Sequence, residues 1–102
     1  PIPYSVSKSA LNTYVKCSAR PLGEKNIRIN AIAPGNIMFK GSVWEQKIKK
    51  NPSTVKNLLK NEVSLHKFGT PEDVANLTAF LSSSKSSFIT GSVYVVDGGQ
   101  IR

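Results

Sequence analysis

The arrangement of two β-forming runs constrains the fold of this chain more than any other feature. Residues 27–33 (IRINAIA) and 92–96 (SVYVV) are rich in β-branched side chains, and the first run is almost continuously apolar. Such runs are typical of strands buried on both faces of a parallel sheet. Helical patterns separate the two runs, and a right-handed crossover through them would make the strands parallel. We therefore predict an α/β protein with the order helix, strand, lid helices, helix, strand.

An amphipathic helix is predicted before the first strand. Apolar and small side chains recur at helical spacing from Tyr4 to about Arg20, as on a helix with one face against a core. An interior proline costs a helix about 3 kcal/mol, so we expect the helix to end or kink at Pro21, with Gly23 as a possible cap. Asn26 suits the following turn, because asparagine tolerates the left-handed backbone conformation.

Two short helices are predicted in the segment between the strands. Ser42 and Glu45 have the spacing of a capping box, and Asn51 with Pro52 interrupts the helix that they open. Residues 38–68 as a whole could form a lid over a substrate or could pack into the core, and both interpretations fit the pattern. The apolar side chains that would form the underside of such a lid include Met38, Phe39 and Trp44.

The last helix has a clear start signal. Thr70 can cap it, Pro71 can occupy its first turn, and Asp73 complements the helix dipole. It leads to the second strand, which Asp97 and two glycines close. Two parallel strands leave both sheet edges uncovered, and the chain begins with Pro1 without a strand before its first helix. We therefore expect this sequence to be the later part of a longer protein.

Tyr4 and Lys8 are the candidate catalytic pair. They lie four residues apart at the start of the first helical pattern, so their side chains share one helix face. A lysine charge near a tyrosine hydroxyl favours the phenolate form. Tyr4 is therefore a candidate proton donor or acceptor. A chance pairing of the two residue types is the alternative.

The loop that follows the first strand is a second site candidate. Pro34 and Gly35 stop the strand abruptly, and the loop continues to Phe39. Ligands of open α/β sheets bind at the carboxyl ends of the strands. A plain turn is the competing interpretation of this loop.

Composition excludes several classes of protein. An apolar fraction of 39% with 20% charged residues is ordinary for a globular domain, and no apolar run approaches the length of a membrane span. We expect a cytoplasmic protein without a signal peptide. The single cysteine, Cys17, has no neighbour with metal-ligand spacing, so we predict an inert, at least half-buried thiol and no metal site.

The net charge of +8 raises the possibility of nucleic-acid binding. Many of the lysines, however, alternate with apolar positions at helical spacing and not with stacking aromatic residues. A solvated helical face explains this pattern. We therefore expect neither a nucleic-acid partner nor a membrane partner.

Four motifs occur in a fixed order along the chain: Tyr4-x-x-x-Lys8, Asn30-Ala-Ile-Ala-Pro-Gly35, Phe68-Gly-Thr-Pro-Glu-Asp73, and Phe88-Ile-Thr-Gly91 through Val96-Asp-Gly-Gly99. Their order and separations resemble the C-terminal part of the short-chain dehydrogenase/reductase family, especially its 3-oxoacyl-acyl-carrier-protein-reductase-like members. The resemblance implies a doubly wound parallel-sheet Rossmann fold that binds NAD or NADP. Residues 1–102 would be the C-terminal part of one NAD(P)-binding domain.

The resemblance also implies roles for particular residues. Tyr4 would protonate the carbonyl oxygen during reduction, while Lys8 would favour ionisation of the tyrosine and hydrogen-bond the nicotinamide ribose. Pro34 and Gly35 would shape the loop against the nicotinamide, and the backbone of Ile37 would contact its carboxamide. The family also implies a small-molecule carbonyl or alcohol substrate and a homo-oligomer, either dimer or tetramer.

The sequence departs from the family pattern at several points. Phe39 replaces a threonine that helps to hold the cofactor in many members. The chain has no G-x-x-x-G-x-G phosphate loop, and the catalytic serine and asparagine of the family are absent. We therefore predict that the 102-residue chain alone binds NAD(P) poorly and is inactive. A non-catalytic module that self-associates through its uncovered sheet and helix surfaces is the alternative, and the substrate and the choice between NAD and NADP stay open.

Overall fold

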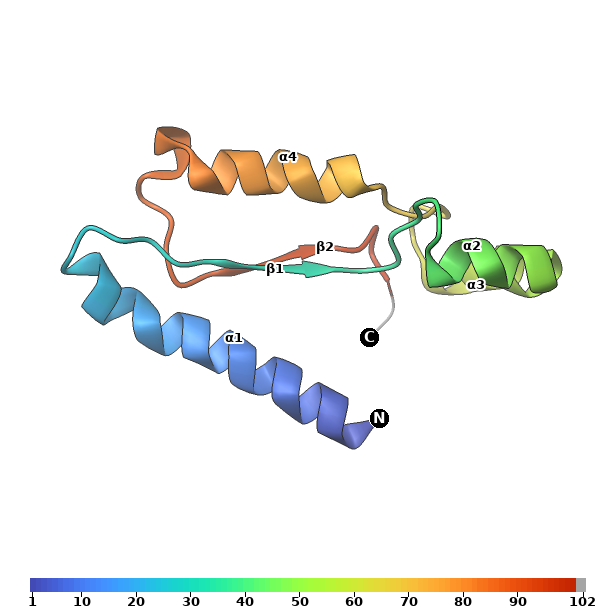
Figure 1. The fold of residues 1–102 in the computed structure, drawn as a ribbon, viewed down its shortest axis with the longest axis horizontal. Helices are drawn as coiled ribbons and strands as arrows, with labels where there is room; N and C mark the ends of the chain where they lie inside the picture. Colours follow the sequence, from blue (N-terminus) through green and yellow to red (C-terminus); the bar gives the residue numbers. More distant parts are fainter. Residues whose placement is uncertain (101–102) are drawn as a thin grey trace. The chain divides into compact units, whose positions relative to one another are not determined.

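A computed structural model describes residues 1–100, and it has the predicted order of elements (Figure 1). The order of helices and strands is α1 (Ile2–Gly23), β1 (Ala31–Pro34), α2 (Val43–Lys50), α3 (Pro52–Glu62), α4 (Pro71–Ser82), a short 3₁₀ turn (Ser84–Ser86) and β2 (Val93–Val96).

The two strands form a parallel pair. The backbone N–H of Ala31 donates to the carbonyl of Ser92, and that of Gly35 donates to the carbonyl of Val96, both at 2.9 Å. The pairing advances by the same number of residues in the same direction on both strands, which defines a parallel ladder. The predicted parallel α/β arrangement is confirmed.

The first strand is shorter and more exposed than predicted. Ahead of β1, the N–H of Ile29 donates to the hydroxyl of Thr90 at 3.1 Å, so a side chain replaces a backbone ladder bond. The positions of β1 are half-buried or exposed, and the Ile27 side chain is exposed. The prediction of a strand over residues 27–33 buried on both faces is therefore wrong, because two strands and their helices do not cover both faces.

The chain divides into two compact units, which are described separately. The first contains Pro1–Ile32 and Thr78–Tyr94, and the second contains Ala33–Leu77 and the described residues from Val95 onward.

In the first unit, α1 continues two residues beyond Pro21, to Gly23, so the helix does not end at the proline itself. The N–H of Glu24 still bonds to the carbonyl of Arg20. The helix is ended by Asn26, whose φ is 59°, while the N–H of Ile27 donates to the carbonyl of Leu22 at 3.0 Å. This is the bonding of a Schellman motif. Asparagine thus supplies the left-handed residue, as predicted, and Gly23 does not act as the cap.

The core of the first unit is small. Val15 and Leu81 are its buried apolar residues. Arg28 supports the core by donating to the carbonyls of Ile89 and Ser83, at 3.3 and 3.2 Å. Cys17 is exposed, which corrects the prediction of an at least half-buried thiol, because α1 has few neighbours along this side. Large apolar side chains remain exposed along α1, and these are Ile2, Tyr4, Val6, Leu11 and Tyr14.

In the second unit, polar caps fix the ends of the lid helices. The Ser42 hydroxyl accepts from the N–H of Glu45 at 3.2 Å, and the Glu45 carboxylate accepts from the N–H of Gly41 at 2.6 Å. The Asn51 side chain accepts from the N–H of Thr54 at 3.2 Å at the start of α3. The cap at Ser42 and the interruption between the helices are therefore as predicted, although the Glu45 carboxylate bonds to Gly41, one residue before the cap, and not to Ser42. The buried apolar residues of this unit are Val55 and Val63.

Candidate functional site

The first turns of α1 bring Tyr4 and Lys8 together. The Lys8 ammonium nitrogen lies 5.4 Å from the centroid of the Tyr4 ring. Tyr4 is 63% exposed, so its hydroxyl is accessible to a ligand. Pro1 lies just before the helix, and Pro3 lies in its first turn. A proline there costs no intrahelical hydrogen bond, because the first N–H groups of a helix have no partner within it. The helix thus presents a phenol and an ammonium side by side at its solvent-exposed start.

Pro34, the last residue of β1, and Gly35 and Ile37 of the following loop all belong to the second unit. A Cβ atom on Gly35 would lie 2.6 Å from the Cβ and 2.8 Å from the Cα of Asp97, so only glycine allows the ends of the two strands to approach this closely. Ile37 forms a parallel bridge with Gly69. A Cβ on Gly69 would meet the end of the Ile37 side chain at 2.7 Å, so a larger residue there would displace that side chain.

A pocket of about 260 Å³ lies at the carboxyl ends of both strands in this unit. Asn36 is one of its lining residues, and the side-chain amide nitrogen of Asn36 is buried without a hydrogen-bond partner among the described residues. Buried donors are nearly always paired in folded proteins. A bound acceptor at this pocket would satisfy the donor. The pocket is lined by Asn36, Leu65, Lys67, Phe68, Gly69, Asp73, Val96, Asp97 and Gly98.

The pocket combines one ammonium group with two carboxylates. Asp73 accepts from the backbone N–H of Thr70 at 2.8 Å, and its own N–H donates to the Thr70 hydroxyl at 3.3 Å. Hydrogen bonding of the Asp73 carboxylate to Thr70, first to its backbone N–H and then to its side chain, lowers the pKa of Asp73 below its usual value of 3.8; burial opposes this shift, and the Lys67 charge adds a smaller lowering effect. Asp73 is therefore held as a carboxylate and fixes the start of α4.

The sequence predicted the loop from Gly35 to Phe39, which contains Asn36, as a site candidate, but it did not indicate Lys67 and Asp97 as residues of this pocket. A usable signal was present, because both β-forming runs end just before the segments that line it. The carboxyl ends of parallel strands share one sheet edge, so Asp97 could have been assigned to the same site as Gly35. The orphaned amide of Asn36, in contrast, depends on the folded environment.

The predicted lid residues have different surroundings. Met38 accepts a hydrogen bond from the buried Ser42 hydroxyl at 3.5 Å, and Phe39 is exposed. Trp44 packs against Phe68, with ring centroids 5.2 Å apart and the planes inclined at 47°. Trp44 therefore anchors α2 to the segment before α4.

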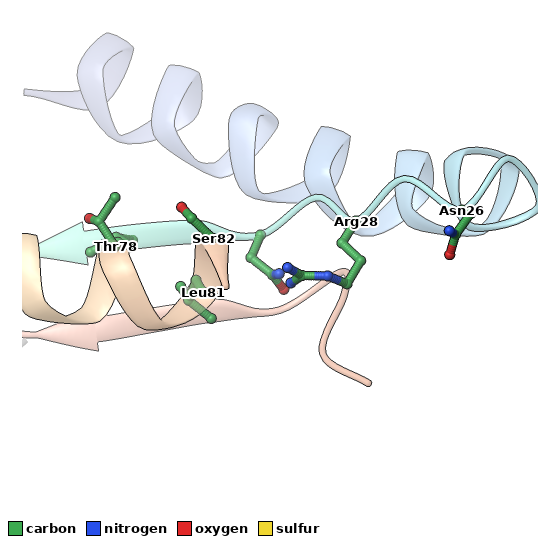
Figure 2. A pocket seen from close by; sticks show the side chains of 7 residues that line it. Asn26, Arg28, Thr78, Leu81 and Ser82 are labelled. Carbon is green, nitrogen blue, oxygen red and sulfur yellow. The ribbon is translucent and has the colours of Figure 1, made fainter. Parts of the chain in front are cut away.

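Another pocket does not contain the candidate catalytic pair. It has a volume of about 460 Å³, lies within the first unit, and is lined by Asn26, Arg28, Asn30, Ile32, Thr78, Leu81 and Ser82 (Figure 2). Arg28 already donates to two backbone carbonyls. Neither Tyr4 nor Lys8 lines this pocket, so we do not assign it as the reactive site.

The residues that the structure describes do not include a cluster of metal-binding side chains. Over residues 1–100, no three His, Cys, Asp or Glu side chains gather closely enough to hold a metal ion. Over the same range, each helix is too short or too polar to cross a membrane.

Comparison with known proteins identifies the family. The chain matches the model of the enoyl-(acyl carrier protein) reductase family over residues 2–100. An uncharacterized oxidoreductase of Schizosaccharomyces pombe is 42% identical over 96 residues, which are 94% of this chain and 36% of that protein.

Two solved structures with bound dinucleotides are similar as well. The 3-oxoacyl-[acyl-carrier protein] reductase of Brucella melitensis with bound NAD is 33% identical, with a TM-score of 0.72 over 95% of this chain and 32% of that one. The L-sorbose reductase of Gluconobacter frateurii, complexed with NADPH and L-sorbose, is 30% identical, with a TM-score of 0.83 over 97% of this chain and 40% of that one.

The chain therefore belongs to the short-chain dehydrogenase/reductase family, as its motifs predicted. Its α/β structure matches part of the Rossmann fold of these proteins. The chain spans about a third of the length of the curated relatives it matches first.

Proposed function

We propose that this chain forms the proton-transfer part of an NAD(P)-dependent oxidoreductase that reduces a carbonyl compound or oxidises an alcohol. The observation that carries the proposal is the exposed pair on α1, where the Lys8 ammonium lies 5.4 Å from the Tyr4 ring. Family membership supports it, and the relatives with bound NAD or NADPH support a nicotinamide cofactor.

In the proposed reaction, Tyr4 donates its phenolic proton to the substrate oxygen during reduction and accepts a proton during oxidation. The bound dinucleotide supplies or takes the hydride. The Lys8 ammonium stabilises the negative charge that develops on the phenolic oxygen and hydrogen-bonds the nicotinamide ribose. A positioned acid of this kind contributes about 10²- to 10⁴-fold to the rate.

Pro34, Gly35 and the backbone of Ile37 would hold the nicotinamide end of the cofactor. The fit is supported by the unpaired Asn36 amide in the adjacent pocket. A carbonyl or phosphate oxygen of the cofactor would accept from that amide. NAD and NADP both meet this requirement, so the proposal covers either cofactor.

Residues 38–68 would act as a lid over a small-molecule carbonyl or alcohol substrate. Helices α2 and α3 of this segment each have a side-chain cap at their first turn, and the Trp44–Phe68 contact anchors α2. A lid built this way moves as a unit, because its internal contacts hold it together. Met38, Phe39 and Trp44 are the apolar side chains that it would offer to a substrate.

We also propose that residues 1–102 act as the C-terminal part of one NAD(P)-binding domain and need further sequence for activity. Support comes from the glycines of the chain, which lie at 23, 35, 41, 69, 91, 98 and 99 and form no phosphate-binding loop. A dinucleotide without a pyrophosphate cradle binds weakly. The 102-residue chain alone should therefore give no detectable NAD(P)H oxidation, and a cytoplasmic location is part of the same proposal.

Self-association is a second candidate function, favoured by the exposed apolar side chains along α1. Ile2, Tyr4, Val6, Leu11 and Tyr14 are each more than half exposed, and exposed large apolar side chains on one helix are a candidate interaction surface. The module would then form dimers or tetramers, with or without catalysis. Light scattering after size-exclusion chromatography tests this, and a clean monomer at micromolar concentration would contradict it.

The test of the catalytic proposal is a chimera. The matched segment of the Gluconobacter frateurii L-sorbose reductase is replaced by this chain, and NADPH oxidation is followed with L-sorbose and a panel of carbonyl compounds. We expect activity in the chimera and its loss in the Tyr4→Phe variant, with NADPH binding retained. A Tyr4→Phe chimera as active as its parent would refute the role of Tyr4.

A further inference from the structure

A small apolar pocket lies between the two lid helices, within the second unit. It has a volume of about 280 Å³, which is near the lower end of known ligand pockets of roughly 300 to 1,000 Å³. Helices α2 and α3 pack against each other to form it. It is lined by Trp44, Lys47, Lys50, Asn51, Thr54, Val55 and Leu58.

The floor of this pocket is apolar and held in place. Val55 is buried and Leu58 is half-buried, so the α3 side of the pocket is part of the packed unit. Trp44 supplies the α2 side, and its ring is fixed by the contact with Phe68 at 5.2 Å. The pocket therefore exists before a ligand arrives.

The rim of the pocket is positively charged. The Lys47 ammonium lies 4.4 Å from the centroid of the Trp44 ring, and Lys50 lines the pocket one turn further along α2. The nearest acid of α2, Glu45, pairs with Lys49 at 3.7 Å instead.

Acidic side chains do not balance this charge locally. The two helices contain five lysines, at 47, 49, 50, 56 and 60, against two glutamates, at 45 and 62. Among the residues that the structure describes, neither Lys47 nor Lys50 has an ion pair with an acidic group. An apolar cavity next to two unpaired ammonium groups is complementary to a molecule that is apolar at one end and anionic at the other.

We propose that this pocket binds an amphipathic anion, with its apolar end on Trp44 and Leu58 and its carboxylate or phosphate beside Lys47 and Lys50. The proposal does not depend on the chemistry of Tyr4, because the pocket residues all belong to α2, α3 and the residue between them. The small volume suits a short chain or one end of a longer molecule.

The single tryptophan of the chain lies in the pocket and reports on binding. Trp44 emission is titrated in the 102-residue chain with octanoate, octyl phosphate and octanol at constant ionic strength. We expect saturable changes with the anions and binding by octanol that is about tenfold weaker, as two exposed charge contacts would give. A stronger response to octanoate or to octyl phosphate identifies the head group, and added salt should weaken the anions only.

Matched variants test which lysines bind the anionic group of the ligand. Lys47→Gln with Lys50→Gln should weaken binding of the better anion about tenfold, whereas Lys56→Gln with Lys60→Gln removes the same charge from α3 outside the pocket, breaks no ion pair of the described residues, and should change little. Leu58→Ser should weaken anion and alcohol alike, and Tyr4→Phe should leave binding unchanged. Equal binding of octanol and the anions, equal losses in the two lysine pairs, or no saturable response in a chain with intact far-UV circular dichroism would each overturn the proposal.

Discussion

Replacing Gly35 by alanine tests whether the ends of the two strands meet as closely as the structure requires. The added Cβ would lie 2.6 Å from the Cβ and 2.8 Å from the Cα of Asp97. Real Cβ atoms do not approach other carbon atoms this closely, and the atoms in the way belong to or adjoin the backbone. The strand ends must therefore separate, and overpacking of this kind costs about 1 to 3 kcal/mol.

The effect can be measured by urea unfolding of the 102-residue chain. Trp44 fluorescence reports on the same unit as Gly35, and far-UV circular dichroism reports on all helices. A loss of 1 to 3 kcal/mol lowers the midpoint by on the order of 1 M urea, given the denaturant sensitivity of small proteins.

Gly23→Ala is the matched control, because a Cβ at Gly23 would meet nothing within 4 Å and its backbone is helical. It should leave stability unchanged or raise it by about 0.4 to 1 kcal/mol. If Gly35→Ala were as well tolerated as Gly23→Ala, the close approach of Gly35 and Asp97 would be refuted.

Three further substitutions probe the local structure. The pKa of Asp73 is lowered in the folded chain, so the stability that its carboxylate contributes is present above the unfolded pKa near 3.8 and is lost as pH falls through the folded pKa. Asp73→Asn should therefore remove the Asp73 contribution to the difference between the urea midpoints at pH 7 and pH 3. Ser42→Ala removes a buried cap and should cost about 1 kcal/mol in thermal or urea unfolding; no loss would contradict the capping role. Asn26→Val should cost about 1 to 2 kcal/mol because φ is 59° there, whereas Asn26→Gly should be tolerated, and equal effects in unfolding experiments would refute the left-handed helix end.

Local signals in the sequence predicted the elements well. The Ser42 helix cap, the Asn51–Pro52 break and the left-handed Asn26 each depend on a few neighbouring residues, and the structure has all three. These features follow from hydrogen bonds and backbone preferences that act over one turn of chain. The predicted order of helices and strands rests on local signals of this kind.

Features that depend on distant parts of the chain were not predictable in the same way. The exposure of Cys17 and the short, half-buried β1 depend on how many neighbours cover each face. The pocket containing Asn36 forms only because two strand ends meet, with Gly35 against Asp97. Sequence periodicity records which side of an element is apolar, but not what lies against it.

The central claim is that Tyr4 transfers the proton, and the chain offers an internal control for it. Tyr4 and Tyr14 lie on the same helix and are both 63% exposed, but only Tyr4 has the Lys8 ammonium beside its ring. In the L-sorbose reductase chimera, the turnover of Tyr4→Phe and Tyr14→Phe should be compared at saturating NADPH. We predict a loss of about 10²- to 10⁴-fold for Tyr4→Phe and nearly full activity for Tyr14→Phe. Equal turnover in the two variants would contradict the assignment of Tyr4 as the proton donor.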